Sequence, residues 1–251
     1  MRTLASLALF LTAATASADL VSDCSFSEKR NVAAPAAGIT RIVIIGRAGT
    51  LHLGGHRGAP QVIAAGTACA SSRGKLNETK LVMSRSGSEL RVEAVMPDDE
   101  IAKLDFDVVV PDNVSLHVED GPGELTIENV GPSEVTDGAG DLTIRNVSGD
   151  LSVHDGSGDM TLENVTGNVR IVDGSGGIAV HGAGSVEIID DSSGWVDISN
   201  IKRDVVIGNK GSGDVKVSDV GGNFRVGNKG SGSITWVRVA GRVDVPERFR
   251  K

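Results

Sequence analysis

Glycines recur at a near-constant spacing through the C-terminal part of this chain. They stand in steps of 17 to 19 residues, at Gly123, Gly140, Gly158, Gly176, Gly194, Gly213 and Gly232. Each step contains two units of eight to ten residues, one ending in Asn-Val and the next in Asp-Gly, as in GDLTIRNVS followed by GDLSVHDGS. A fixed period of this length indicates stacked structural units that contact only their neighbours.

Apolar and polar residues alternate within each unit. Leu142 and Ile144 flank Thr143, and Leu151 and Val153 flank Ser152. A period of two is typical of a β-strand with its apolar side chains on one face. Two short strands and two turns fit each repeat of roughly 18 residues, and stacking the repeats about 4.8 Å apart buries a continuous apolar strip. We therefore predict an all-β fold, a parallel β-solenoid with two sheets.

Two columns of turn residues support this register. At one corner a small apolar residue follows Asn or Asp in nearly every repeat, in the pairs Asn129-Val130, Asn146-Val147, Asn164-Val165, Asn200-Ile201 and Asp219-Val220. The apolar residue suits a buried corner. The Asn amides are expected to hydrogen-bond from coil to coil, as in the ladders of cross-β stacks.

At the other corner an aspartate column is expected, formed by Asp120, Asp137, Asp155, Asp173 and Asp191 and continued by Asn209 and Asn228. Most members precede glycine, and an Asp-Gly or Asn-Gly step supplies the positive φ of a tight turn. That requirement alone accounts for the column. A distant alternative is a calcium column, because carboxylates stacked about 5 Å apart repel each other and cations would relieve the repulsion. The match to glycine-rich calcium repeats is poor, because Asp159 directly precedes the apolar Met160.

The chain divides into three parts. Residues 1–18 have the features of a signal peptide, with Arg2, an apolar run from Leu4 to Leu11, and Ala16-Ser17-Ala18 as the cleavage site. Residues 19–110 are expected to form an irregular β-region that covers the first coil, with strands at 42–45, 51–53, 80–82, 90–92 and 104–110. Residues 111–251 form the solenoid and its C-terminal cap, with Trp236 and Phe249 closing the core.

The signal peptide predicts an exported protein, periplasmic or at the surface of a bacterium. No later stretch reaches transmembrane length. In an oxidising compartment Cys24 and Cys69 are expected to form one disulfide, which would close a loop of some 45 residues and contribute about 3–4 kcal/mol. A metal or redox pair is the alternative, but the chain has no Cys-x-x-Cys spacing and no nearby histidine cluster.

Composition and charge exclude several functions. A net charge of −8 argues against nucleic-acid binding, and 3 % aromatic residues with no tyrosine argue against an aromatic-lined cleft. The five histidines are single and scattered, and no catalytic constellation is found, so no enzyme activity is predicted. Residues 111–199 carry a net charge of −15, whereas residues 200–251 carry +6. This asymmetry could steer head-to-tail association or docking on an anionic surface.

The signal peptide, the phrase Phe106-Asp107-Val108-Val109-Val110-Pro111 and the alternating G-D-L-T-I-x-N-V and G-D-L-S-V-x-D-G-S units resemble the "putative adhesin" family of bacterial β-strand-repeat proteins. The resemblance covers roughly residues 40–245. It implies an exported β-solenoid without known catalytic residues, and no site is carried over from it.

The leading hypothesis is a non-enzymatic exported scaffold, or adhesin-like interaction module, that presents flat faces to an envelope protein or polymer. The alternative is a self-associating structural polymer joined through the solenoid ends, as in bactofilin-type proteins. The signal peptide and the charged tail weigh against this alternative. No cofactor is predicted apart from the distant calcium alternative, and the partner is not identified by the sequence.

Overall fold

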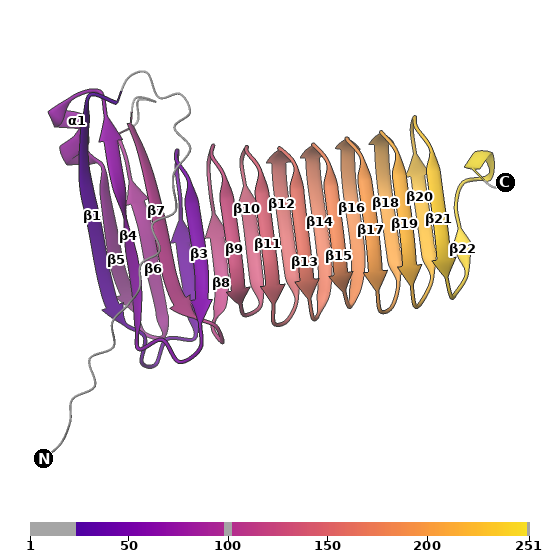
Figure 1. Cartoon of the computed structure of the whole chain (residues 1–251), viewed down its shortest axis with the longest axis horizontal. Helices are drawn as coiled ribbons and strands as arrows, with labels where there is room; N and C mark the ends of the chain where they lie inside the picture. The colour runs from indigo at the N-terminus through magenta and orange to yellow at the C-terminus, as the bar shows by residue number, and fades with distance from the viewer. Residues whose placement is uncertain (1–23, 98–101, 250–251) are drawn as a thin grey trace, which may run out of the picture.

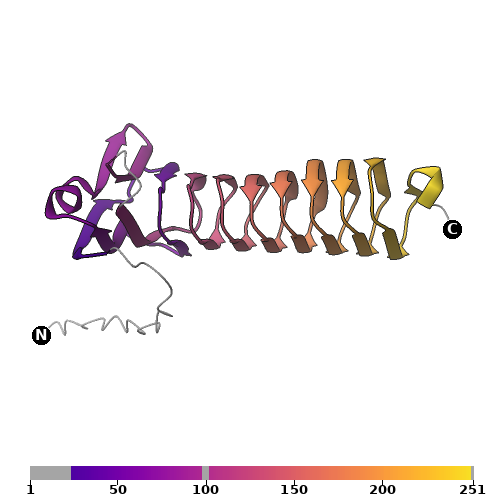
Figure 2. The same cartoon turned by 90° about the horizontal axis from the view of Figure 1, so that it is seen from above.

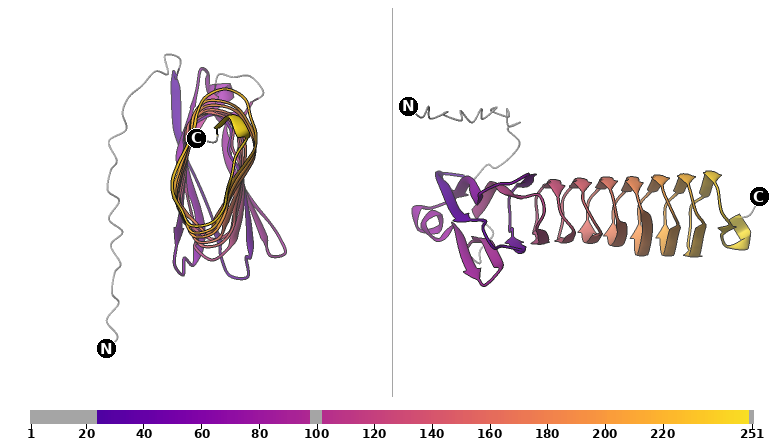
Figure 3. Two further views of the ribbon diagram at one scale, coloured as in Figure 1. Left: turned by 90° about the vertical axis from the view of Figure 1, so that its right-hand side faces the viewer. Right: turned by 90° about the horizontal axis from the view of Figure 1, so that it is seen from below.

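The structure is a computed structural model that describes residues 24–97 and 102–249, so the predicted signal peptide at 1–18 lies outside it. The chain forms a rod of stacked β-coils with a broader N-terminal end (Figure 1). Turned by 90°, the rod shows two layers of strands joined by short corners (Figure 2). Viewed along its axis, the coils superpose as a flattened oval (Figure 3). The predicted β-solenoid is confirmed, with about 7 turns of about 19 residues.

Two sheets of eleven strands each enclose the core. We call them sheet A and sheet B. In spatial order, sheet A contains β1 (Phe26–Pro35), β4 (Gln61–Ala70), β7 (Ala102–Pro111), β3 (Leu51–His56), β9 (Leu125–Val130), β11 (Leu142–Val147), β13 (Met160–Val165), β15 (Ile178–Ala183), β17 (Val196–Ile201), β19 (Val215–Val220) and β21 (Ile234–Val239). Sheet B contains β22 (Val243–Asp244), β20 (Phe224–Lys229), β18 (Val205–Ser212), β16 (Ser185–Ser193), β14 (Asn168–Ser175), β12 (Leu151–Ser157), β10 (Ser133–Asp137), β8 (Ser115–Glu119), β2 (Arg41–Ile45), β6 (Glu89–Val95) and β5 (Lys80–Ser86).

Like residues stack along the rod axis. Leu142 pairs with Leu125 on one side and Met160 on the other, in parallel register one coil apart. The alternating apolar side chains point inward and are almost fully buried in one continuous cluster. Each buried Leu, Ile or Val contributes about 1.5–3 kcal/mol, so the strip between the sheets holds the coils together.

The corner that leads from sheet A to sheet B is the Asn–Val corner, formed by the Asn-Val pairs identified in the sequence. Val147 is buried, and the Asn146 amide donates to Asn129 Oδ1 at 3.0 Å and accepts from Asn164 at 3.1 Å. The predicted amide ladder is therefore confirmed for these coils. The asparagines also have φ near +60°, the left-handed region in which Asn is the best tolerated residue after glycine.

The opposite corner, from sheet B to sheet A, is the Asp–Gly corner. Here the prediction that the Asp-Gly step supplies the positive φ is wrong. Gly138 and Gly156 are not among the residues of positive φ, whereas Gly140 and Gly158, two residues further on, have φ of +129° and +132°. The turn therefore depends on the glycines of the repeat period, and the aspartates are left free for another role.

The N-terminal region joins the solenoid without a break. β2 pairs in parallel with β8, and β3 pairs in parallel with β9, so these two strands form a coil in register with the later ones. β1, β4 and β5 add antiparallel strands beyond it. All five strands expected between residues 42 and 110 are present, while β1, β4 and the short helix α1 (Arg73–Glu78) were not predicted.

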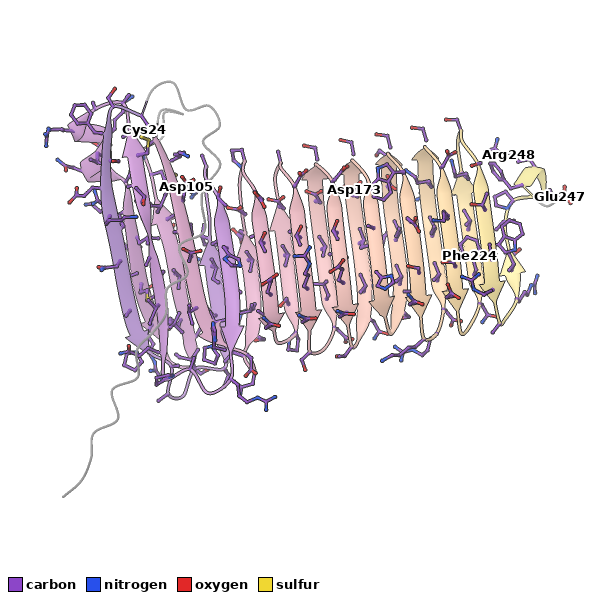
Figure 4. The ribbon with its side chains drawn as sticks, in the orientation of Figure 1. Cys24, Asp105, Asp173, Phe224, Glu247 and Arg248 are labelled. Carbon is purple, nitrogen blue, oxygen red and sulfur yellow. A yellow bond between two sulfur atoms is a disulfide. The ribbon has the colours of Figure 1, made fainter. Side chains whose placement is uncertain are left out.

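Both ends of the rod are closed by irregular elements. At the N-terminal end the predicted Cys24–Cys69 disulfide is present, with Cα atoms 5.5 Å apart, and it ties the start of β1 to β4 (Figure 4). At the other end the 3-10 helix η1 (Glu247–Phe249) folds back, and Trp236 and Phe249 pack on the core as expected. Within the two described ranges, no helix is long and apolar enough to cross a membrane.

Candidate functional site

The outward face of sheet A carries polar side chains in rows along the rod. Glu128, Arg145 and Glu163 occupy the same position in successive coils. The Arg145 guanidinium bridges the two carboxylates, at 2.9 Å to Glu163 and 3.4 Å to Glu128. Such exposed pairs contribute little to stability, but they fix the order of charges on the face.

The outward face of sheet B carries a second set of rows and a shallow groove. His117 lies between Glu119 and Glu134, with ring nitrogens 2.9 and 3.1 Å from their carboxylates. The groove has a volume of about 570 Å³ and runs across the starts of the strands from β2 to β16. Arg41, Glu134, Asp150, Arg170 and Glu187 are among its lining residues, so the groove carries both basic and acidic groups.

The rim of this groove is held by hydrogen bonds between coils. Asp150 Oδ1 accepts from the backbone N–H of Asn168 at 2.7 Å and from its side-chain amide at 3.1 Å. Asn168 Oδ1 in turn accepts from Ser185 at 2.7 Å and from Arg203 at 2.6 Å. The groove is thus a fixed surface that spans several coils.

The aspartate column lies inside the rod. Asp137, Asp155, Asp173 and Asp191 are at most 3 % exposed, and Asp120 is half-buried at the N-terminal end of the column. Parallel pairing places Asp137, Asp155, Asp173 and Asp191 in successive coils. Figure 4 labels Asp173 within the stack of coils. We call the five residues the aspartate file.

The predicted continuation of the file through Asn209 and Asn228 is wrong. The strand register aligns Asp191 with Lys210 and Lys229, while Asn209 and Asn228 continue the exposed position of Asp190. An irregularity in the pairing of β14 with β16, near Ile171 and Val172, accompanies the added residue of that coil. The later glycine steps of 19 residues, applied from Asp191, would have identified both lysines.

The carboxyls of the file have abnormal acidity. Burial is the largest cause, and it raises the pKa of Asp120 to about 7, of Asp137 to about 6 and of Asp173 to about 7. The negative charge of neighbouring aspartates adds to the shift at all three residues. Burial also raises the pKa of Asp155 and of Asp191, and Lys210 partly offsets the shift at Asp191.

The two lysines end the file on the C-terminal side. Lys210 Nζ lies 2.8 Å from Asp191 Oδ2, and both side chains are fully buried. Burial lowers the pKa of Lys229, and the charge of Lys210 acts in the same direction. Lys229 donates to the backbone carbonyl of Ser231, and Arg248 donates to the carbonyl of Lys229, so the 3-10 helix covers this end of the file.

The other candidate groups do not converge on one site. His154 and His181 are exposed, as expected, and they lie on different sheets. In the described parts of the chain, no group of three or more His, Cys, Asp or Glu side chains is arranged to hold a metal ion. The broad polar faces, the groove and the aspartate file are thus the features that call for a function.

The rod of stacked coils defines the chain as a β-solenoid, and the chain is similar to solved structures. A "putative adhesin" from Bacteroides fragilis NCTC 9343 has a TM-score of 0.55 and 15 % identity, covering 89 % of this chain and 99 % of that chain. A "putative cell adhesion protein" from Clostridium sporogenes ATCC 15579 has a TM-score of 0.40 and 11 % identity, covering 88 % and 99 %.

The Bacteroides structure has the same fold, which confirms the resemblance drawn from the repeat motifs at the level of architecture. No protein-family model matches the sequence, and no curated protein matches it.

Proposed function

We propose that the protein is a non-enzymatic, exported interaction module, an adhesin-like rod that docks on a protein or polymer of the bacterial envelope through the outer face of sheet B. One observation carries this proposal. The groove on that face is lined by residues of consecutive coils, and it therefore presents polar groups at the fixed spacing of hydrogen-bonded strands.

The chemistry of the groove favours a polar, extended partner. Arg41 and Arg170 can pair with anionic groups, whereas Glu134 and Glu187 can accept from hydroxyls or amines. The scarcity of aromatic residues in the chain argues against sugar stacking as the main mode of binding. The name given to the Bacteroides protein of the same fold supports an adhesive role.

The remaining parts of the chain fit export. We propose that residues 1–18 are removed as a signal peptide, that residues 19–110 act as the N-terminal cap, and that residues 111–251 form the solenoid and its terminal cap. The Cys24–Cys69 disulfide is of the kind that persists in the periplasm or outside the cell.

End-to-end polymerisation is less well supported. Residues 19–110 contain 11 basic and 11 acidic residues, a net charge of zero, whereas residues 200–251 carry +6. The acidic segment between them carries −15. A neutral end gives the basic end no net attraction, so charge does not favour the head-to-tail contact that a filament needs.

Retention of the labelled protein on bacterial envelope preparations tests the proposed face. The groove variant would combine Glu134→Lys with Glu187→Lys. The matched control would combine Glu128→Lys with Glu163→Lys on sheet A, which makes the same change of charge and also removes ion pairs. We expect retention to fall at least about tenfold for the groove variant alone, a difference of about 1.4 kcal/mol.

Two results would contradict the proposal. In one, the two variants lose retention equally, which would indicate a general charge effect. In the other, the unmodified protein is retained no better than an unrelated acidic protein of similar size.

A further inference from the structure

The aspartate file is a buried arrangement that an interaction module does not need for docking. Its members occupy the Asp–Gly corner of successive coils, and the strands that carry them are hydrogen-bonded neighbours. Neighbouring carboxyls are therefore about 5 Å apart at the backbone. Two carboxylates at this distance repel each other strongly when water is excluded.

Hydrogen bonding does not relieve this repulsion. The backbone N–H groups of Gly121, Gly138 and Gly156 lie near three of the carboxyls and lower their pKa in part. Even so, none of the ten carboxylate oxygens of the file accepts a hydrogen bond of normal geometry. Polar atoms that are buried to this extent normally have a hydrogen-bond partner, so these oxygens need a donor that the neighbouring protein groups do not supply.

The charged groups that face the file are few. The charge of His154 lowers the pKa of Asp155, and the charge of Asp190 raises the pKa of Asp191. The charge of Lys210 lowers the pKa of Asp173 and of Asp191, and the charge of Lys229 also lowers the pKa of Asp191. The inward side chains of the sheet A strands that close the same coils are apolar, as in β11 and β13. The two lysines lie at one end, and among the described residues no cation contributes to the pKa shifts of Asp120 and Asp137.

We propose that the aspartate file is an internal proton-binding site, in which protons taken from solvent are held between carboxyls of neighbouring coils and link the coils through carboxyl–carboxylate hydrogen bonds. Each shared proton supplies the missing donor and removes one negative charge from the core. Asp155 and Asp173 are placed to form a pair of this kind, because parallel register sets them side by side in neighbouring coils and both are at most 3 % exposed. Lys210 balances the charge that remains on Asp191.

The direction of the pH effect follows from the raised pKa values. In the unfolded chain an aspartate releases its proton near pH 4, whereas in the rod Asp120, Asp137 and Asp173 release theirs between about pH 6 and 7. Between these limits the folded state binds more protons than the unfolded state. The contribution of these carboxyls to the free energy of unfolding is therefore complete below about pH 4 and is lost as the pH rises through 6 to 7. The rod should be more stable in mild acid than in mild base.

Thermal unfolding of the purified chain between pH 5 and pH 8 tests the proposal, together with carbon-13 NMR titration of the aspartate carboxyls. We expect the Tm to be higher at pH 5 than at pH 8 by on the order of 5 °C. At least two aspartates should titrate with midpoints above pH 5.5. The Asp173→Asn variant should keep or raise the Tm at pH 8 and show a smaller pH dependence. The exposed Asp107→Asn, on the outer face of sheet A, should leave the pH dependence unchanged.

Three results would overturn the proposal. One is a Tm of the unmodified chain that does not fall between pH 5 and pH 8. Another is a titration in which every aspartate has its midpoint below pH 4.5. The third is a rise of Tm on adding calcium at pH 8 that Asp173→Asn abolishes, since a cation rather than protons would then neutralise the file. The NMR titration needs no variant, so the proposal remains testable even if Asp173→Asn fails to fold.

Discussion

Lys210 is among the largest fully buried side chains of the described residues, and it shows how a single residue sets the charge of the core. A lysine in this position loses its hydration, a loss of several kcal/mol, and its contact with Asp191 is what compensates. The pair also ends the run of acids, because beyond it the same position in the coil carries Lys229. The charge of the core is thus neutralised locally, by one ion pair at the end of the file and by protons on the other carboxyls.

Replacing Lys210 with methionine tests this balance. Lys210→Met leaves a buried carboxylate without its cation, so we expect a loss of about 3–5 kcal/mol in the free energy of unfolding at pH 8. Combining Lys210→Met with Asp191→Asn removes the unpaired carboxylate of Asp191 and should recover more than half of that loss. Urea denaturation measures both variants. A single variant within about 0.5 kcal/mol of the unmodified protein would show that the pair does not carry this role.

At the scale of the element, the corner glycines determine how closely the coils can stack. Gly158 has φ of +132°, and a Cβ placed on it would lie 1.8 Å from the carbonyl oxygen of Gly140 in the coil before. The same close approach recurs along the column, at Gly140, Gly176 and Gly213. The glycine period is therefore a steric requirement of the stack.

Gly158→Ala should break this contact. Both the conformation and the space exclude a side chain, so we expect a loss of about 3 kcal/mol or more in the free energy of unfolding, measured by urea denaturation. Gly54→Ala in β3 is the matched control, because a Cβ there meets nothing within 4 Å and φ is not positive. It should change stability by less than about 1 kcal/mol in either direction. Equal losses in the two variants would contradict the steric role of the corner.

The sequence predicts the strands of the solenoid well, because the alternation within a strand and the repeat between coils identify the same residues as inward. Leu142, Ile144 and Met160 are identified as inward residues by period two, and their pairing follows from the repeat.

Asp155 continues the period of two from Leu151 and Val153, and all three are buried in β12. The alternation therefore already indicates an inward aspartate, but its burial is unexpected because a carboxyl is rarely buried without a partner. Gly158, three residues after Asp155, has a positive φ and turns the chain toward the next strand.

The N-terminal elements that were not predicted lack such a signal. β4 contains the run Ala64-Ala65-Gly66, which has low strand propensity, and it is held by pairing with β1 and β7 on its two sides. Helix α1 is a six-residue element, too short for an apolar period, and it depends on its cap, in which Ser72 accepts from the backbone N–H of Lys75 at 3.3 Å. Tertiary contacts, which one sequence does not reveal, decide both elements.

At the scale of the whole molecule, the rod is held by contacts between neighbours along its axis. β14 contacts β12 and β16 within its sheet, and the disulfide lies at the far N-terminal end. In a one-dimensional stack of this kind, stability is close to a sum of local terms, so a change at one end should not reach the other end directly. The disulfide is a suitable place to test that property, because it ties β1 to β4 without contributing to any coil of the solenoid body.

The double variant Cys24→Ser with Cys69→Ser should therefore weaken one end of the rod. Opening a 45-residue loop is expected to remove about 3–4 kcal/mol from the unit that contains it. Hydrogen exchange should show lost protection in β1 and β4, while β14, β16 and β18 keep theirs. Reduction of the unmodified protein is the control, since it opens the same loop without a substitution and should give the same pattern. A loss of protection spread evenly along all coils would mean that the rod unfolds as a single cooperative unit, and that the N-terminal cap holds the entire stack.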